Sequence, residues 1–449
     1  MKPTMYFRFE KFYCKNNPSI RDLVNLDRSF IGNFLQEHPA GFRFSQVVDT
    51  ILEYYKINSD AEETIKFLPI DDTDQTGYII PIAVCYHPND WTDMTDGIYD
   101  KSKTSIFEEI HPRYLKDMQN GRALLLIDQS VEGYSTTWLW PWFHEKLQQY
   151  NLNPECIIYL TGDQSCEDTY NIWCQDNNIK HKIKTIPSIS LSMYINKKAN
   201  NIKVNFDDII MYKTKNTNSL YLYDCTNMRP RPQRVLAYLH LINSNLINKG
   251  NISMAAPSEW YMDITALDYL EKYNLPKDLP LKVDLHAPAK LANYFGDIEI
   301  NKSDHYYRYV ERILNKMYEN SWLSVITESS YFDYEYNVFI SEKTFKPIAC
   351  MQPFIIVGSK NTLFYLKKLG YKTFAPWINE DYDTLNDSER FVAIITELKR
   401  IDAIEDKVTW YNGMKEILEY NYNLFMKIGK VKSIEHLAIN KYYFDYFKE

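Results

Sequence analysis

Residues 121–163, "GRALLLIDQSVEGYSTTWLWPWFHEKLQQYNLNPECIIYLTGD", alternate between two kinds of segment. Short apolar runs at 123–128 and 156–163 are typical of buried strands, and residues 136–151 between them have the length and spacing of a helix. A strand, a helix and a second strand in this order form the unit from which parallel sheets are built. This stretch therefore predicts an α/β fold.

The alternation continues with a predicted helix at 166–177 and strand at 179–186, and it restarts after a polar-rich connection at 201–218. Two such series predict two Rossmann-like βαβ lobes facing a cleft, an N-terminal lobe over 1–217 and a C-terminal lobe over 218–449. The second series comprises predicted strands at 219–224, 321–328 and 353–359, and predicted helices at 231–250 (closing at Gly250), 263–274, 304–320, 342–350, 361–371, 388–401 and 406–429. The terminal helices are expected to pack back across the hinge.

Residues 1–120 have a weaker pattern, with a helix predicted at 19–38 and a strand at 77–87. The chain has a net charge of -8, which gives no sign of a nucleic-acid-binding protein. Its seven cysteines include no CxxC pair, which favours reduced thiols in a cytoplasmic compartment, the host cytoplasm if the protein is viral. The sequence shows no signal peptide and no apolar run of about 20 residues that would predict a membrane span.

Ser341, Glu342, Lys343 and Lys346 stand at the predicted start of a helix, just before the apolar strand "PFIIVG". Ser341 is a suitable N-cap, and the positive end of a helix dipole attracts an anion. Two lysines three residues apart lie on one helix face, and the positive end of the dipole would repel their charges. A diphosphate bound between them is one explanation for their presence. Glu342 is then placed to accept hydrogen bonds from a ribose diol. The alternative is a solvated first turn with the lysines in water.

A second basic cluster, "RPRPQR", follows the predicted strand 219–224 and contains Arg229, Arg231 and Arg234. Arginine binds phosphate oxygens with two parallel hydrogen bonds, and the neighbouring prolines fix the backbone in advance. The cluster predicts a rigid anion-binding loop. Arginines that pair with surface carboxylates are the alternative.

Glu328 ends the predicted strand 321–328, and in a parallel sheet that end faces the ligand. We therefore expect Glu328 to contact the substrate. The aromatic segment 329–339, Tyr336 included, is a candidate for stacking on a base or a sugar, unless it simply packs on the core.

In the first lobe, Asp128 and Glu132 follow the predicted strand 123–128 and are candidates for a general base, with His87 as a second choice. Either carboxylate can also be an ordinary turn residue. Asp72 and Asp74 form an Asp-x-Asp that can hold a divalent ion, but such tripeptides are common in polar turns. The chain contains no GxxxxGK[ST], GxSxG or HExxH motif.

The segment "ITESSYFDYEYNVFISEKTFKPIACMQPFIIVG" resembles the donor-binding region of α1,3-fucosyltransferases, in which Glu-Asn-Ser after a strand leads to a Thr/Ser-Glu-Lys helix. Glu328-Ser329-Ser330 and Ser341-Glu342-Lys343 occupy those places, although Ser329 replaces Asn and the spacer is longer. "DCTNMRPRPQRVLAYL" is similar to the entry of the family's donor domain, with Arg234 nearest to its basic residue. The resemblance covers roughly 218–375 and extends to glycosyltransferase-like proteins of phages and large viruses.

The resemblance implies a glycosyltransferase B (GT-B) architecture and transfer of a sugar from a nucleotide-diphosphate sugar to an acceptor hydroxyl, with inversion as in fucosyltransferases. Positive side chains would replace a metal, so neither a metal nor a tightly bound cofactor is expected. Three other interpretations stay open: a phage-type enzyme that glycosylates hydroxymethyl-pyrimidine bases of DNA, a non-catalytic nucleotide- or sugar-binding module, and a structural protein of a virion.

Overall fold

The computed structural model describes residues 3–8, 64–67, 77–83, 107, 110, 112–130, 133, 139–199, 204–227, 231–254, 315–333, 337–428 and 433–448. The chain divides into two compact units: unit 1 is Met1–Met193 with Ile428–Glu449, and unit 2 is Tyr194–Lys427. This division lies before the 217/218 boundary expected from the sequence. Within the described ranges, no helix is long and apolar enough to cross a membrane.

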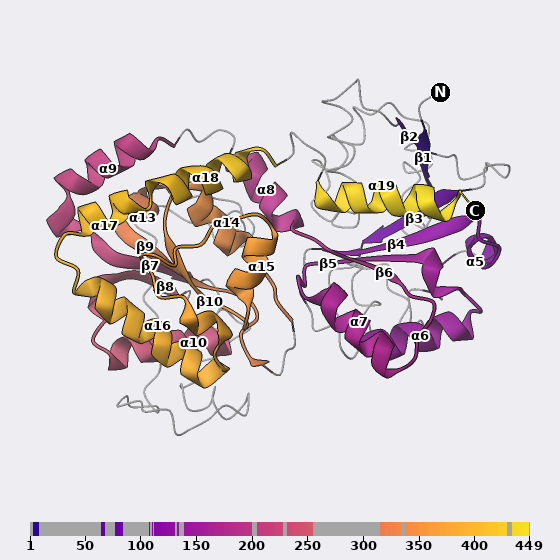
Figure 1. Ribbon diagram of the computed structural model, residues 1–449, viewed down its shortest axis with the longest axis horizontal. Coiled ribbons are helices and arrows are strands. Elements are labelled where there is room, and N and C mark those ends of the chain that lie inside the picture. The colour runs from indigo at the N-terminus through magenta and orange to yellow at the C-terminus, as the bar shows by residue number, and fades with distance from the viewer. Residues whose placement is uncertain are drawn as a thin grey trace, which may run out of the picture. The chain divides into compact units, whose positions relative to one another are not determined.

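Unit 1 is built on a six-stranded sheet in the order β2-β1-β3-β4-β5-β6 (Figure 1). Every neighbouring pair is parallel. The strands are β1 (Thr4–Phe7), β2 (Thr64–Phe67), β3 (Tyr78–Ala83), β4 (Ala123–Gln129), β5 (Ile157–Thr161) and β6 (Lys184–Pro187). All seven residues of β4 are buried, as expected of a central strand that is covered on both faces.

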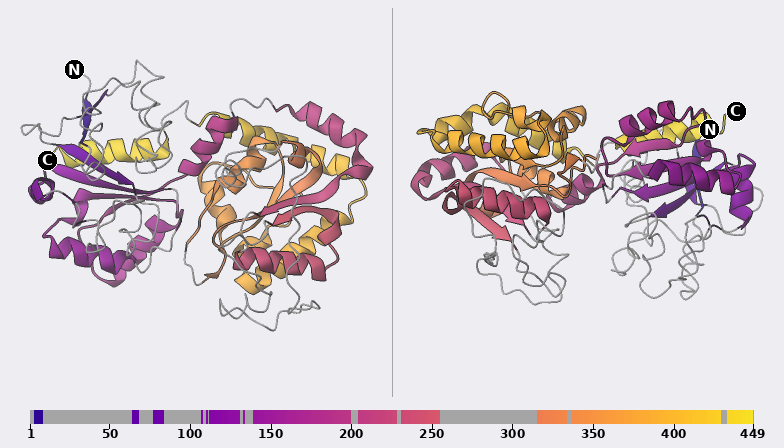
Figure 2. Two further views of the ribbon diagram at one scale, coloured as in Figure 1. Left: turned by 180° about the vertical axis from the view of Figure 1, so that it is seen from behind. Right: turned by 90° about the horizontal axis from the view of Figure 1, so that it is seen from below.

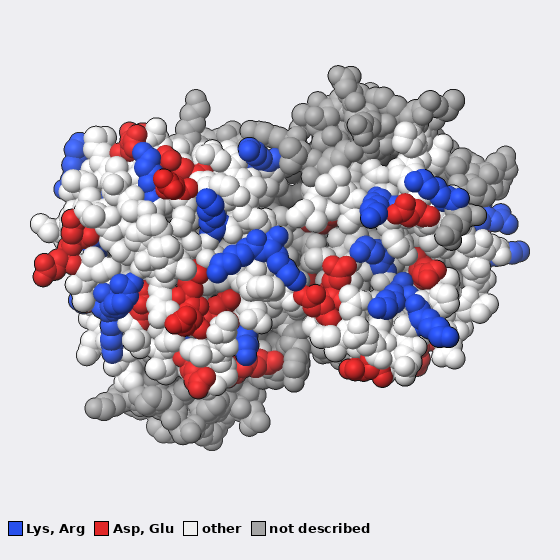
Figure 3. Space-filling view, viewed as in Figure 1, with Lys and Arg blue, Asp and Glu red and all other residues white. Residues whose placement is uncertain are grey.

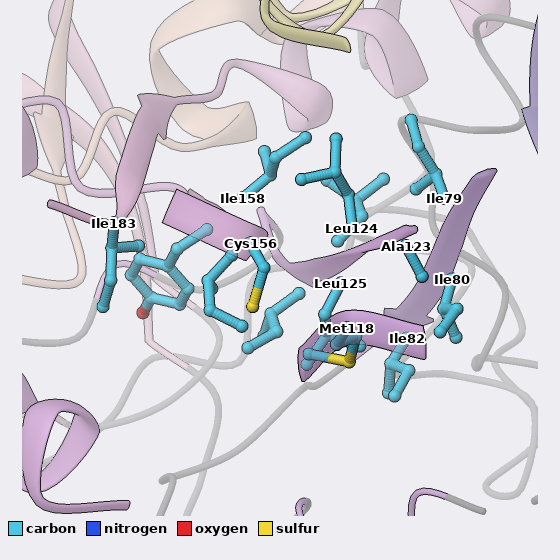
Figure 4. Close-up of a cluster of buried hydrophobic side chains, with 14 of the residues drawn as sticks. Ile79, Ile80, Ile82, Met118, Ala123, Leu124, Leu125, Cys156, Ile158 and Ile183 are labelled. Atoms are coloured by element: carbon cyan, nitrogen blue, oxygen red, sulfur yellow. The ribbon is translucent and has the colours of Figure 1, made fainter. Parts of the chain in front are cut away.

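Side chains from β3, β4 and β5 meet those of the helices in a continuous apolar core (Figure 4). Met118 of α5, for example, lies among Ile80, Ile82 and Leu125 (Figure 4). Helices α6 and α7 lie on one side of the sheet and α19 on the other (Figures 1 and 2). The helices of this part are α5 (Pro112–Gln119), α6 (Leu139–Gln149), α7 (Cys166–Asp176), α8 (Ser190–Ala199), which spans the division between the units, and α19 (Ile434–Tyr446).

Unit 2 contains a four-stranded parallel sheet in the order β10-β9-β7-β8. The strands are β7 (Tyr221–Asn227), β8 (Gly250–Met254), β9 (Ser321–Thr327) and β10 (Phe354–Val357). Because the strands are parallel, Asn227, Thr327 and Val357 end at the same edge of the sheet. Two parallel sheets with helices on their faces confirm the predicted α/β class with two Rossmann-like lobes.

Helices cover both faces of the second sheet. On one side α10 packs with α16, and on the other α14 packs with α18 (Figures 1 and 2). The helices are α9 (Phe206–Lys215), α10 (Pro232–Asn243), α13 (Asn315–Glu319), α14 (Glu342–Ala349), α15 (Thr362–Lys368), α16 (Asp387–Asp402), α17 (Lys407–Gly413) and α18 (Lys415–Met426). Short 3₁₀ helices span Pro154–Cys156, Thr217–Ser219, Ile247–Lys249 and Asp381–Thr384.

Two sequence predictions are wrong here. The polar-rich connection at 201–218 contains helix α9, which Asn205 caps by accepting from the N–H groups of Asp207 and Asp208. Gly250 does not close a helix, because α10 ends at Asn243 and Gly250 begins β8. A Cβ atom at Gly250 would lie 2.3 Å from the ring of Tyr223 on the neighbouring strand, so close packing explains the glycine.

The last helix, α19, belongs to unit 1, whereas α16, α17 and α18 belong to unit 2. The hydroxyl of Tyr443 donates to the carbonyl of Gly77, and that of Tyr442 donates to the carbonyl of Glu155. The carboxylate of Glu435 accepts from the Ser188 hydroxyl at 2.9 Å and the Ile189 N–H at 2.8 Å. These bonds fix the C-terminal helix to the sheet of unit 1. The helices predicted at 19–38 and 263–274 lie outside the described residues.

Candidate functional site

The end of strand β9 and the start of helix α14 are joined by one carboxylate, that of Glu328. It accepts hydrogen bonds from the Ser341 N–H at 3.1 Å, from the Ser341 hydroxyl and from the Thr344 hydroxyl at 2.7 Å. Ser341 is the N-cap, and its hydroxyl also accepts from the N–H of Lys343. The first turn of α14 is therefore held by a charged group that favours the positive helix end.

Glu328 has a relative exposure of 0%, and its carboxylate is used by protein donors. The ammonium of Lys343 lies 3.8 Å from it as well. This environment does not support the expectation that Glu328 contacts the sugar, because the carboxylate would have to break these hydrogen bonds to reach a ligand. A buried carboxylate with several donors holds local structure instead.

Glu342 and the two lysines form a closely coupled charge cluster. The ammonium of Lys343 lies 3.1 Å from the Glu342 carboxylate and donates to the Ser341 hydroxyl at 2.8 Å. Burial alone would raise the pKa of Glu342, but Lys343 and Lys346 outweigh burial and hold that pKa at about 2. Burial lowers the pKa of Lys346 to about 8, against the opposing effect of Glu342. Because Lys346 is buried and Glu342 is mostly covered, this is not a solvated first turn.

The start of helix α10 lies beside the same carboxylates. Gln233 donates to the carbonyls of Glu328 at 2.8 Å and Ser329 at 2.7 Å, and Arg231 donates to the carbonyl of Ser329 at 3.3 Å. Arg234 is buried, and burial together with Arg231 lowers its pKa to about 10, whereas Glu342 and Glu328 oppose that shift. The loop after β7 and the start of α14 therefore belong to one site.

The structure thus brings together seven of the predicted site residues at the carboxyl edge of the second sheet. Two helices, α10 and α14, begin here, and each adds the positive end of its dipole. Such an arrangement can bind a multiply charged anion such as a diphosphate. The residues are Arg231, Arg234, Glu328, Ser341, Glu342, Lys343 and Lys346. Arg229 and Tyr336 lie outside the described residues.

Gln233 and Thr344 are site residues that the sequence reasoning missed. Each is an uncharged side chain whose partner is distant in sequence: Gln233 contacts the backbone after β9, and Thr344 contacts Glu328. The sequence places Thr344 in the first turn of a helix capped by Ser341, but it does not indicate that this turn faces the end of β9. No sequence pattern indicates the role of Gln233.

The carboxyl edge of the first sheet carries Asp128, the predicted base. Asp128 is 3% exposed, and its carboxylate accepts from the N–H of Ser130 at 2.9 Å. On the next strand, Asp163 follows β5 and accepts from the N–H and the hydroxyl of Ser165. Asp163 is a second carboxylate at this edge that sequence reasoning did not single out, although its place after a buried strand is the same as that of Asp128. Glu132 lies outside the described residues.

The charged side chains on the face shown in Figure 3 occur in small groups of both signs. In the described part of the chain, no group of three or more His, Cys, Asp or Glu side chains is arranged to hold a metal ion. His87, Asp72 and Asp74 lie in stretches that the structure does not describe.

Comparisons with known proteins give a distant likeness. No family model matches the chain, and no curated protein matches it. Among solved structures, it is similar to α,α-trehalose 6-phosphate synthase from Burkholderia multivorans, with 10% identity and a TM-score of 0.39 over 91% of this chain and 76% of that one. It is also similar to the N-terminal domain of Candida albicans trehalose-6-phosphate phosphatase, with 10% identity and a TM-score of 0.41 over 90% of this chain and 74% of that one. At these values the likeness assigns no activity to this chain, and the account of its fold rests on the two parallel sheets.

Proposed function

We propose that the chain is a glycosyltransferase whose unit 2 binds a nucleotide-diphosphate sugar. One observation carries the proposal: Arg231, Arg234, Lys343 and Lys346 converge with Glu342 where helices α10 and α14 begin. Parallel α/β sheets bind their ligands at this edge. A diphosphate offers the negative charge that such a cluster favours.

The cations stabilise the leaving group. When the bond from the anomeric carbon to the diphosphate oxygen breaks, the diphosphate keeps the bonding electrons and gains negative charge. Lys343 and Lys346, with Arg231 and Arg234, are fixed before the reaction, so they stabilise that charge without reorganising. Glu342, with a pKa of about 2, stays ionised at neutral pH and accepts hydrogen bonds from a ribose diol.

Glu328 supports this site without touching the donor. Its carboxylate holds Ser341 and Thr344, and through them it fixes the direction of the first turn of α14. Lys343 and Lys346 both extend from that helix. Glu328 is therefore a positioning residue in this proposal.

The acceptor belongs to unit 1. Its hydroxyl oxygen attacks the anomeric carbon, and a carboxylate takes the hydroxyl proton. Asp128 and Glu132 are the two candidates for that base. The finer assignment is an inverting, fucosyltransferase-like enzyme that needs no metal. It rests on the resemblance in residues 218–375. Activity that survives EDTA would support the absence of a metal requirement.

A thermal-shift screen with UDP, GDP, dTDP, CDP, ADP and the matching nucleotide sugars tests the proposal. A ligand at 100 times its Kd should add about 2.7 kcal/mol to the free energy of unfolding. We expect stabilisation by at least one of them and its loss in the double variant Lys343→Ala/Lys346→Ala. The matched control is Lys367→Ala/Lys368→Ala, which removes the same charge from helix α15. Equal ligand shifts in both double variants, or no shift in the parent, would overturn the proposal.

A further inference from the structure

Arg390 of helix α16 joins two loops at the carboxyl edge of the second sheet. Its Nη1 atom donates to the carbonyl of Tyr331 at 2.8 Å and to that of Gly358 at 2.9 Å. Its Nη2 atom donates to the carboxylate of Asp333 at 2.7 Å and to the carbonyl of Leu385 at 3.0 Å. Tyr331 and Asp333 belong to the loop after β9, and Gly358 directly follows β10.

This guanidinium is one of the most deeply buried charged groups described, with a relative exposure of 1%. It lies 4.8 Å from the centre of the Tyr331 ring, so the cation is stabilised by an aromatic face as well. A planar group with several donors at fixed angles suits four acceptors in different directions, whereas a lysine offers three donors from a single point. The position therefore requires arginine for geometry as well as for charge.

Both loops adjoin Glu328, the residue that holds the start of α14. The N–H of Glu328 donates to the carbonyl of Val357 at 2.9 Å, and a Cβ atom at Gly358 would lie 3.5 Å from the Cβ of Glu328. Arg390 thus fixes the backbone that packs against Glu328. Glu328 in turn holds Ser341 and Thr344 at the start of α14.

The same loop is held from its other side. Gln233, at the start of α10, donates to the carbonyls of Glu328 and Ser329. The loop after β9 is therefore bonded on one side to the start of α10, through Gln233. On the other side, Arg390 links it to the loop after β10. The backbone hydrogen bonds of the sheet stop at the ends of its strands. Beyond that point, the side chains of Gln233 and Arg390 hold neighbouring loops together.

We propose that Arg390 is a positioning residue of the anion site: it sets the place of Glu328 and so the direction of Lys343 and Lys346. This inference rests on the proposed function, because it assigns Arg390 a part in ligand binding. Arg390 itself contacts no ligand. If its role were only structural, substitution would lower stability and leave the affinity of the folded protein unchanged.

The test compares Arg390→Lys with Arg400→Lys in the full chain. Arg400 lies on the same helix and bonds to Glu397 and to the carbonyl of Trp377, away from both loops. Affinity for UDP, GDP, dTDP, CDP and ADP is measured by calorimetry well below the lowest melting temperature, so that every variant is folded. We expect at least tenfold weaker binding in Arg390→Lys and less than a twofold change in Arg400→Lys. Amide hydrogen exchange without ligand should accelerate in 329–333 and 358–361 only in Arg390→Lys.

Equal affinity of the parent and Arg390→Lys would overturn this inference and leave the proposed function intact. If the parent binds none of the five nucleotides, the proposed function fails and the inference fails with it. Should Arg390→Lys not fold, Asp333→Ala serves as a milder variant, because it removes one acceptor of the guanidinium from a half-exposed position. We then expect about threefold weaker binding, which is a change of about 0.7 kcal/mol, and unchanged binding would overturn the inference.

Discussion

The carboxyl edges of the two sheets differ in chemistry although both sheets are parallel. The edge of unit 2 gathers Arg231, Arg234, Lys343 and Lys346 around two carboxylates. The edge of unit 1, in its described part, carries the carboxylates Asp128 and Asp163, with neighbouring serine hydroxyls and amides. The same type of parallel sheet therefore carries a cluster of cations at its carboxyl edge in one unit and a cluster of carboxylates and hydroxyls in the other.

The fold thus determines where a site forms, and the side chains determine what it binds. Parallel strands deliver polar residues to the same edge in both units. A cationic edge suits a diphosphate, and an edge with carboxylates suits the removal of a proton from an uncharged hydroxyl. This difference supports a division of labour in which unit 2 binds the donor and unit 1 activates the acceptor.

The largest effect is expected at the edge of unit 1. If Asp128 is the base, Asp128→Asn should lower kcat by about 10²–10⁴-fold and leave the affinity for the donor unchanged, because the proposed donor site lies in the other unit. Initial rates of nucleoside diphosphate release measure this. Asp163→Asn is the control and should retain activity within about threefold. A loss in Glu132→Gln alone would transfer the role to Glu132, and full activity in both variants would refute the division of labour.

Glu328→Gln should cost about 3 kcal/mol of unfolding free energy, because the amide cannot replace a carboxylate that accepts three hydrogen bonds in a buried site. Asp163→Asn in unit 1 should cost about 1 kcal/mol, since the amide oxygen can still accept from Ser165. Urea denaturation of both variants measures the difference. Equal costs would mean that the two edges are stabilised alike.

Lys346→Met should weaken the binding of the nucleoside diphosphate by about tenfold, or 1.4 kcal/mol, because a buried cation of the site is lost. It should also lower the stability of the ligand-free protein, because the buried carboxylate of Glu342 loses one of the two lysines that stabilise its charge. Lys367→Met on helix α15 is the control for affinity. Unchanged affinity of the folded variant for the nucleoside diphosphate would show that Lys346 is part of the fold rather than of the binding site.

The pH dependence should follow Lys346, whose pKa of about 8 lies below its ordinary value of 10.5. If the diphosphate binds beside Lys346, it favours the protonated lysine, so Kd should rise above pH 8 and level off about tenfold higher, the loss expected of Lys346→Met. The free energy of unfolding of the ligand-free protein should increase with pH between 8 and 10.5. In that range the unfolded chain binds more protons at this lysine than the folded protein does. Titrations from pH 7 to 9.5 check the affinity, and a flat profile identical to that of Lys346→Met would contradict this.

Much of the fold was predictable because its strands are strongly apolar. The runs at 123–128, 156–163 and 321–328 became β4, β5 and β9, all fully buried. Helix α9 was missed because its apolar residues are not confined to one face: Phe206 and Ile209 are buried, whereas Met211 is exposed. The prediction that Gly250 closes a helix was wrong because the sequence does not reveal that β7 pairs with β8. That pairing places Gly250 against Tyr223, where a larger residue would not fit.

In the candidate site, the gathering of the cations was predictable from the sequence, and the contacts of the carboxylates were less so. Lys343, Lys346, Arg231 and Arg234 follow strands in the sequence, and parallel topology brings the ends of those strands together. The pairing of Glu328 with Ser341 and Thr344 could not be read from the sequence, because it depends on the direction in which the loop after β9 returns. Arg390 lies far along the chain, and only the packing of α16 shows what it holds.

The most direct test is a crystal structure of the protein with the nucleoside diphosphate that stabilises it most. We expect both phosphates at the start of α14, within hydrogen-bonding distance of Lys343 or Lys346 and of Arg231 or Arg234. The ribose should then lie against Glu342, and Glu328 should keep its bonds to Ser341 and Thr344. Phosphates bound at the carboxyl edge of the first sheet, or away from both edges, would contradict the assignment of unit 2 as the donor-binding unit.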